Sequence, residues 1–186
     1  MSTILDAVIE NRYQAVQDFL TGGADPNTID PSDGTTLVYN AIFFQYYAIA
    51  KLLLESGANP NLGSIFPIYD AVIINDLASV KLLLQFGASP DVVFNNSTLL
   101  HWATFHALTE IVRALLNAGA FTNVKNEIGE TPIQFAVYRN NLVIVNLLLA
   151  AGADPAIKSD IGKNAIDYAN FYCLVDIIAV LNKSQL

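Results

Sequence analysis

The sequence predicts an all-α solenoid, in which pairs of helices repeat along the chain and short turns join them. A Leu-rich run that closes on Gly-Ala recurs five times, and the glycines of successive copies lie 34, 30, 32 and 33 residues apart. A period near 33 residues is typical of arrays in which each helix pair buries its apolar side against the next pair. The five glycines are Gly23, Gly57, Gly87, Gly119 and Gly152.

The first helix of a period is expected to begin at a Thr-Pro pair, which is clearest in residues 129–136. Thr131 is placed to cap this helix, and Pro132 takes its first position, where a fixed φ and a missing N–H cost least. A small residue then recurs at one site of each copy, where neighbouring helices must approach closely. These residues are Ala41, Ala71, Ala103, Ala136 and Ala169.

The second helix of a period carries apolar residues at spacings of three and four, as Val143 or Ile144 does with Leu147 and Leu148. Gly152 is expected to end this helix, because the chain takes a positive φ there. Pro155 cannot continue a helix, so an extended turn towards the next unit is expected to begin beside it.

These residues make the chain resemble the ankyrin-repeat proteins over essentially its whole length. The family's TPLHxA helix opening is matched in part by residues 131–136 and 98–103, and more loosely by residues 36–41 and 66–71. The resemblance implies a single ankyrin domain over residues 1–186, with about four full repeats, two capping units and short β-turn or hairpin fingers. The predicted units are an N-terminal cap (1–30), repeats at 31–60, 61–92, 93–125 and 126–158, and a C-terminal cap (159–186).

Two departures from the family pattern carry expectations of their own. The 30-residue step predicts a shortened or irregular finger near residues 61–63. The family's His position holds His101 in one repeat, where a structural hydrogen bond is expected. It holds Tyr39, Tyr69 and Gln134 in three others, and these replacements are expected to weaken the hydrogen bonding between turns.

The resemblance also places a candidate binding surface. In this family the two residues before the turn inside each repeat help to line the concave face and are normally polar, whereas here they are mostly apolar or aromatic. An exposed stripe of this kind usually marks an interaction site. Aromatic residues at helical spacing can instead pack between adjacent repeats, and the sequence leaves that alternative open. The stripe comprises Phe43, Phe44, Ile73, Ile74, Phe105, His106, Tyr138, Arg139, Phe171 and Tyr172.

The fingers form a second candidate surface, which combines acidic residues with apolar tips. Acidic residues in turns most often belong to solvated loops, so a single one of them is weak evidence of a binding site. Together with the stripe and a formal charge of −8, they indicate a groove that prefers a basic, partly apolar protein partner. The finger residues are Asp33, Ile65, Phe94, Glu127, Ile128, Glu130 and Asp160.

Composition narrows the class of protein. Hydrophobic residues make up 53% and charged residues 14%, which excludes a disordered chain. The acidic balance argues against a nucleic-acid binder, and no apolar run reaches the ~18 residues that a membrane span needs. No signal peptide is expected, because Asp6, Glu10 and Arg12 interrupt the start of the chain. Cys173 is the single cysteine and cannot form an internal disulfide, so a cytoplasmic location is expected. If the protein is a bacterial effector, it is expected to be translocated instead.

Catalytic chemistry is not expected from this sequence. His101 and His106 lie five apart and diverge on a helix, so no shared metal site follows, and no cofactor motif is found. Trp102 is expected to pack inside its helix pair. The predicted function is a non-enzymatic protein-binding module that inhibits or sequesters its partner. The alternatives are an immunity-type inhibitor of a basic toxin, an adaptor or effector of an intracellular bacterium, and a self-associating scaffold that forms homo-oligomers.

Overall fold

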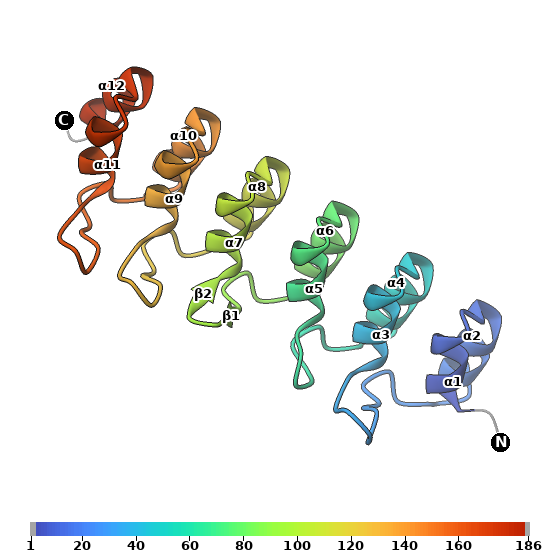
Figure 1. The fold of residues 1–186 in the computed structure, drawn as a ribbon. Coiled ribbons are helices and arrows are strands. Elements are labelled where there is room, and N and C mark those ends of the chain that lie inside the picture. The colour runs from blue at the N-terminus through green and yellow to red at the C-terminus, as the bar shows by residue number, and fades with distance from the viewer. Residues whose placement is uncertain (1–2, 185–186) are drawn as a thin grey trace. The chain divides into compact units, whose positions relative to one another are not determined.

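A computed structural model describes residues 3–184, and this part of the chain forms consecutive pairs of α-helices joined by longer connections (Figure 1). The chain separates into two compact units, Met1–Ser89 and Pro90–Leu186. The boundary falls inside the predicted repeat at residues 61–92. The division of the sequence into one domain with caps and repeats stays a prediction.

The first unit holds six helices. Short helices alternate with helices of nine residues, and each short helix packs against the long helix that follows it. The short helix α3 also contacts α1 and α5, and the long helix α2 contacts α4. The bounds are α1 (Ile4–Ile9), α2 (Tyr13–Thr21), α3 (Leu37–Phe43), α4 (Tyr47–Glu55), α5 (Pro67–Ile73) and α6 (Leu77–Gln85).

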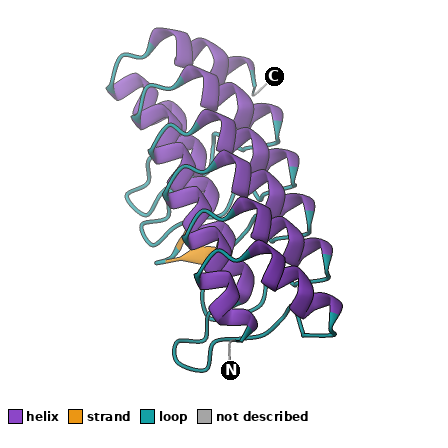
Figure 2. Cartoon of the chain, turned by 90° about the vertical axis from the view of Figure 1, so that its right-hand side faces the viewer, coloured by secondary structure: helices purple, strands orange, loops and turns teal. Residues whose placement is uncertain are grey.

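The second unit repeats this arrangement and adds one hairpin. Short α9 lies between short α7 and α11, and long α10 lies between long α8 and α12 (Figure 2). The hairpin pairs Val93 with Thr98 and Phe94 with Ser97. The bounds are β1 (Val93–Phe94), β2 (Ser97–Thr98), α7 (Leu99–Phe105), α8 (Thr109–Asn117), α9 (Pro132–Tyr138), α10 (Leu142–Ala150), α11 (Ala165–Phe171) and α12 (Val175–Lys183).

The local signals of the repeat act as predicted. The Thr36 hydroxyl accepts the N–H of Tyr39 at the start of α3, and Pro132 opens α9. The five aligned alanines are fully buried, which allows the short helices of each unit to approach closely. The glycines at the five helix ends all have φ between 83° and 93°, a conformation that glycine adopts without steric cost.

The turn inside each helix pair also uses the left-handed region, at a residue four positions after the aligned small residue. Glycine does not occupy this site, and φ lies between 51° and 60°. Asparagine, which tolerates this conformation best among the other residues, stands there in half of the cases. The residues are Asn11, Gln45, Asn75, Ala107, Asn140 and Cys173.

The irregular finger predicted near residues 61–63 is confirmed. Helix α4 ends at Glu55 and α5 begins at Pro67, which makes this the shortest connection between two pairs in the described part of the chain. Gly63 takes a φ of 99°, and the N–H of Ser64 bonds the Gly34 carbonyl at 3.4 Å. A backbone hydrogen bond therefore holds this short finger against the preceding one.

Successive connections are joined by a side chain four residues after each of the first four helix-ending glycines. Asn61 is typical: its amide donates to the Gly87 carbonyl at 2.8 Å, and its Oδ1 accepts the N–H of Ser89 at 2.8 Å. We call these residues the asparagine clamp, since each one bridges two consecutive turns. The same pair of bonds is made by Asn27 and Asn123, and Asp91 accepts the Phe121 N–H at 2.8 Å.

None of the helices within residues 3–184 is long and apolar enough to cross a membrane.

Candidate functional site

The residues of the predicted stripe lie at the carboxyl ends of the short helices. Nine of the ten are exposed and Ile73 is half-buried. Phe43 is 56%, Tyr138 57% and Phe171 78% accessible to solvent, whereas the apolar residues of the core are at most 8% accessible. These nine side chains therefore lie at the surface, where Phe105 and Tyr138 also contact rings of the next repeat, and a binding role for them stays a prediction.

In the first unit the exposed rings of Phe43 and Phe44 form a cluster with the half-buried rings of two tyrosines, and we call it the first aromatic surface (Tyr39, Phe43, Phe44 and Tyr46). The Phe43 ring meets Phe44 edge-on at 5.2 Å and stacks on Tyr39 at 5.9 Å, and Phe44 stacks on Tyr46 at 5.6 Å. Burial raises the pKa of Tyr39 to about 12, assisted by its hydrogen bond to Asp70 on α5. Tyr39 on α3 therefore lies next to Asp70 on α5.

In the second unit the exposed rings of α7, α9 and α11 form the second aromatic surface (Trp102, Phe105, His106, Tyr138, Phe171 and Tyr172). Tyr138 meets Tyr172 edge-on at 5.8 Å, so the surface continues from one repeat to the next. The prediction for Trp102 is wrong: its side chain is 38% exposed and its ring lies 4.2 Å from that of His106. The Arg139 guanidinium lies 5.3 Å from the centre of the Phe105 ring, a cation–π contact.

A cavity of about 280 Å³ lies beside this surface, and we call it the aromatic pocket. Its walls come from α7, α9 and α11 and from the connection before α9. The Tyr168 hydroxyl donates to Oε1 of Glu130 at 2.6 Å. Burial, with this hydrogen bond, raises the pKa of Tyr168. The pocket is lined by Phe105, Glu130, Gln134, Phe135, Tyr138 and Tyr168.

Two buried side chains at the family's His position hold the backbone around this pocket. The carbonyl of Glu130 can only accept, so Nε2 of His101 donates to it at 3.0 Å, and Nδ1 accepts the Thr98 N–H at 3.2 Å. The structural hydrogen bond predicted for His101 is confirmed. Burial lowers the pKa of its imidazole.

Gln134 performs the same task one repeat later. Its Nε2 donates to the carbonyls of Ile157 at 3.2 Å and Lys163 at 2.9 Å, and its Oε1 accepts the Thr131 N–H at 2.6 Å. The expectation that Gln134 weakens the bonding between turns is wrong, because a glutamine amide reaches the neighbouring carbonyls as the imidazole does.

The predicted finger residues differ in their exposure to solvent. Six of the seven are exposed, whereas Glu130 is half-buried and belongs to the aromatic pocket. Asp33 instead shapes its own turn: it accepts the N–H and the hydroxyl of Thr35, and these bonds lower the pKa of its carboxyl. The exposed six are Asp33, Ile65, Phe94, Glu127, Ile128 and Asp160.

Sequence reasoning missed Phe135 and Tyr168, although both line the aromatic pocket. Each directly precedes an aligned alanine, as Trp102 does one repeat earlier. Aromatic residues at one site of three consecutive repeats were the available signal, since side chains at equivalent positions of stacked helices lie on one face.

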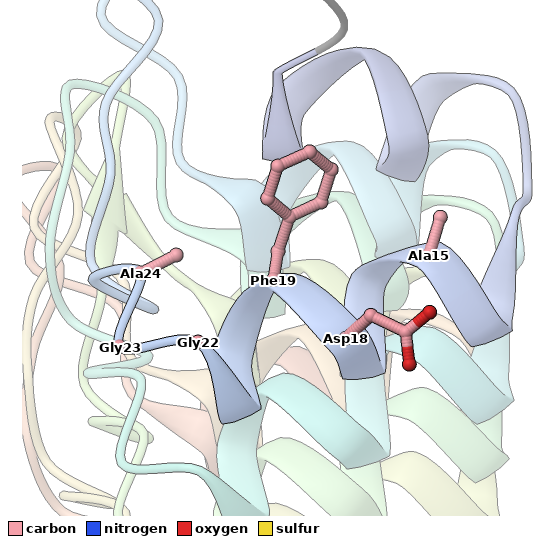
Figure 3. A pocket seen from close by; sticks show the side chains of 6 residues that line it. All are labelled: Ala15, Asp18, Phe19, Gly22, Gly23 and Ala24. Atoms are coloured by element: carbon pink, nitrogen blue, oxygen red, sulfur yellow. The ribbon is translucent and has the colours of Figure 1, made fainter.

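A larger hollow of about 650 Å³ lies at the end of the first helix pair (Figure 3). All of its lining residues belong to α2 or to the three residues after it, so it is a hollow of one element rather than a cleft between elements. Asp18 provides its one charged group. A binding pocket usually brings several polar groups together, and this one does not. Its lining is Ala15, Asp18, Phe19, Gly22, Gly23 and Ala24.

Within residues 3–184, no three His, Cys, Asp or Glu side chains are grouped in a way that could hold a metal ion.

The sequence matches a known protein family and resembles solved structures of that family. Residues 4–93, 68–159 and 100–183 match the model of a family described as ankyrin repeats, three copies. An ankyrin repeat domain from Acinetobacter baumannii is 25% identical, covers 98% of this chain and 97% of its own, and superposes with a TM-score of 0.86. The ankyrin repeat protein EF0377 is also 25% identical, with a TM-score of 0.80 and coverage of 97% and 96%.

The likeness to one further solved structure concerns the fold alone. The ankyrin repeat domain of Bcl-3, a member of the IkappaB family, is 23% identical, covers 99% of this chain and 86% of its own, and has a TM-score of 0.76. A mitochondrial disaggregase of Bos taurus is 30% identical over 142 residues, which are 73% of this chain and 21% of that protein. The putative ankyrin repeat protein FPV222 of fowlpox virus is 27% identical over 148 residues, 73% of this chain and 18% of its own. The chain thus spans about a fifth of these relatives' length.

Proposed function

Because the chain belongs to the ankyrin-repeat family, whose domains generally bind proteins, we propose that it is a non-catalytic module that binds a protein partner through the carboxyl ends of its short helices. The observation that supports this most is the exposure of aromatic side chains in three of the four predicted full repeats, with Ile74 exposed in the fourth. Contiguous exposed aromatic groups cost solubility unless a partner covers them, and buried aromatic anchors supply most of the energy of many interfaces.

The charge of the chain supports a basic partner. A formal charge of −8 attracts cationic surfaces and repels nucleic acid. Seventeen acidic residues stand against nine basic ones, and Glu127 and Asp160 are exposed in the connections of the second unit. A partner with a basic, partly apolar surface fits both the charge and the rings.

Inhibition or sequestration is the form of binding that we propose. A partner covered by the aromatic surfaces loses access to whatever its own surface binds, and no further activity of the module is needed. The immunity-type inhibitor is a special case of this proposal, with a basic toxin as the partner. The adaptor or effector of an intracellular bacterium stays an alternative, which would use the same binding surface.

A capture experiment with two matched triple variants tests the proposal. The wild type and a Phe43→Ala/Phe105→Ala/Tyr138→Ala variant are immobilised and exposed to lysate of the source cells. Each exposed ring that becomes buried contributes about 1–3 kcal/mol to binding, so the partner should be lost from this variant. Circular dichroism must first show that the variant is folded.

The control variant removes exposed apolar groups from the long helices instead. Tyr47, Val143 and Val175 are each at least 45% exposed, and their replacement by Ala should leave capture unchanged. Equal capture by the wild type and by the aromatic variant would contradict the proposal.

Self-association is the second candidate, and the same exposed rings favour it, since a second copy can cover them. Light scattering over a range of concentrations decides between the two. A mass that stays at the 20.2 kDa of one chain at every concentration excludes the homo-oligomer. Self-association is supported if the mass of the wild type rises with concentration and the mass of the Phe43→Ala/Phe105→Ala/Tyr138→Ala variant does not.

A further inference from the structure

The aromatic pocket combines four rings with one carboxylate, and this combination is not found in the other cavities described above. Phe105, Phe135, Tyr138 and Tyr168 supply the rings, and Glu130 supplies the charge. The negative face of an aromatic ring attracts a cation, and the attraction grows when the cation leaves water. A pocket of this composition is suited to a group that is both positively charged and partly apolar.

The charge of Glu130 is not neutralised within the described residues. Its Oε1 accepts the Tyr168 hydroxyl, a bond between a neutral group and a carboxylate, and no Lys, Arg or His of residues 3–184 forms an ion pair with it. The side chain is half-buried, so its charge is screened less than that of an exposed residue. Its backbone is fixed on both sides, by His101 at the carbonyl and by Asn126 at the N–H.

The rim of the pocket shows that its rings accept a cation. Arg139 lies outside the lining, yet its guanidinium stands 5.3 Å from the centre of the Phe105 ring. The Phe135 ring meets Phe105 edge-on at 5.8 Å and His101 edge-on at 5.7 Å, so packing holds this wall in place. The volume of about 280 Å³ exceeds several times the ~30 Å³ that a water molecule takes up in the liquid, which is room for one long side chain.

We propose that the aromatic pocket binds one lysine or arginine side chain of the protein partner, with its stem between the rings and its charge at the Glu130 carboxylate. The inference rests on the proposed function and names the chemistry of the partner at this site. The acidic chain attracts a basic partner from a distance, and the pocket then selects one cationic side chain at short range.

Peptide titrations of the whole chain test this inference. The probes are capped pentapeptides with a central lysine or arginine between alanines, and a matched peptide with norleucine, which has the apolar stem without the charge. Two-dimensional NMR is expected to show shifts at Glu130, Phe135 and Tyr168 with the lysine and arginine peptides at millimolar concentrations, and none with norleucine.

The variant Glu130→Gln isolates the charge. Its amide oxygen still accepts the Tyr168 hydroxyl, so the unfolding midpoint should stay near that of the wild type, whereas affinity for the lysine peptide should fall by about tenfold. Glu110→Gln removes the same charge from an exposed site on α8, outside both candidate surfaces, and should leave binding unchanged. Arg139→Gln removes a like charge at the rim and should raise affinity by about twofold.

Three results would overturn the inference: equal shifts with lysine and norleucine, unchanged binding by Glu130→Gln, or no shift with any peptide. They are distinct from failure of the proposed function. A partner captured equally by the wild type and by Glu130→Gln, yet lost from the Phe43→Ala/Phe105→Ala/Tyr138→Ala variant, would refute the cation site and leave protein binding standing. Lysine binding without any effect of the aromatic substitutions on capture would do the reverse.

Discussion

The imidazole of His101 and the amide of Gln134 perform one task in two consecutive repeats. Each accepts the N–H of the threonine that starts its helix and donates to a carbonyl of the next connection. The two differ in one respect that experiment can reach, because an imidazole takes up a proton and an amide does not. His101 is neutral in this arrangement, since its Nδ1 accepts a hydrogen bond while its Nε2 donates one.

The stability of the chain should therefore depend on pH through His101. Burial lowers the pKa of the folded imidazole below its ordinary value of 6.5. Above pH 6.5 both states are neutral and the contribution of His101 is constant. As the pH falls through 6.5 the unfolded chain takes up a proton that the folded chain resists, so the free energy of unfolding decreases.

Urea unfolding at pH 7.5 and 5.5 measures this effect. The wild type should lose stability between the two pH values. His101→Gln should lose less, because an amide takes up no proton. The substitution should keep the hydrogen bonds, because glutamine already makes them at position 134. Carboxylates such as Asp33 titrate in both proteins, so their share cancels in the comparison. An equal loss in the wild type and in His101→Gln would show that the imidazole does not carry this pH dependence.

At the scale of elements, each connection depends on its asparagine clamp. Asn123 donates to the Gly152 carbonyl at 3.2 Å and accepts the Asp154 N–H at 2.8 Å. Asn123→Asp keeps the acceptor and loses the donor, so we expect it to lower the free energy of unfolding by about 1 kcal/mol, and Asn123→Ala by about twice as much. Urea denaturation measures the series.

The control for this series is Asn117→Ala, at the end of α8, where the substitution removes an asparagine away from the clamp. It should change the free energy of unfolding by less than about 0.5 kcal/mol. A loss of the same size in Asn117→Ala and Asn123→Ala would mean that the bridging bonds contribute nothing measurable.

The sequence predicts the elements better than it predicts the sites between them. Thr36, Pro132 and the glycines at the helix ends act through their own backbone, and such local effects are readable in one dimension. The aromatic pocket is different, because Glu130, Phe135 and Tyr168 belong to two repeats and meet only when these stack. The clamp is intermediate: asparagine recurs four residues after three of the five helix-ending glycines, but the groups that it bonds lie about one repeat away.

At the scale of the whole molecule, charge and pocket should act together. Salt screens the attraction between the acidic chain and a cationic ligand, with a Debye length of about 10 Å at 0.1 M. The affinity for the lysine peptide should fall several-fold between about 0.05 M and 0.5 M salt, and Glu130→Gln should show a smaller fall. Titrations at four salt concentrations measure both slopes. Parallel slopes for the two proteins would place the screened attraction outside the pocket.

The asparagine clamp also limits how such a chain can change its length over evolutionary time. Each clamp bonds the carbonyl of the next helix-ending glycine and an N–H two residues beyond it, so a connection is held by a side chain of the connection before it. An insertion or deletion of a whole period presents the same two groups to the same side chain. A change of length within the finger is also tolerated: Asn61 makes both bonds across 26 and 28 residues, whereas Asn27 makes them across 30 and 32. The clamp therefore constrains the spacing between the helix-ending glycine and the residue four places after it, and it leaves the length of the finger free to change.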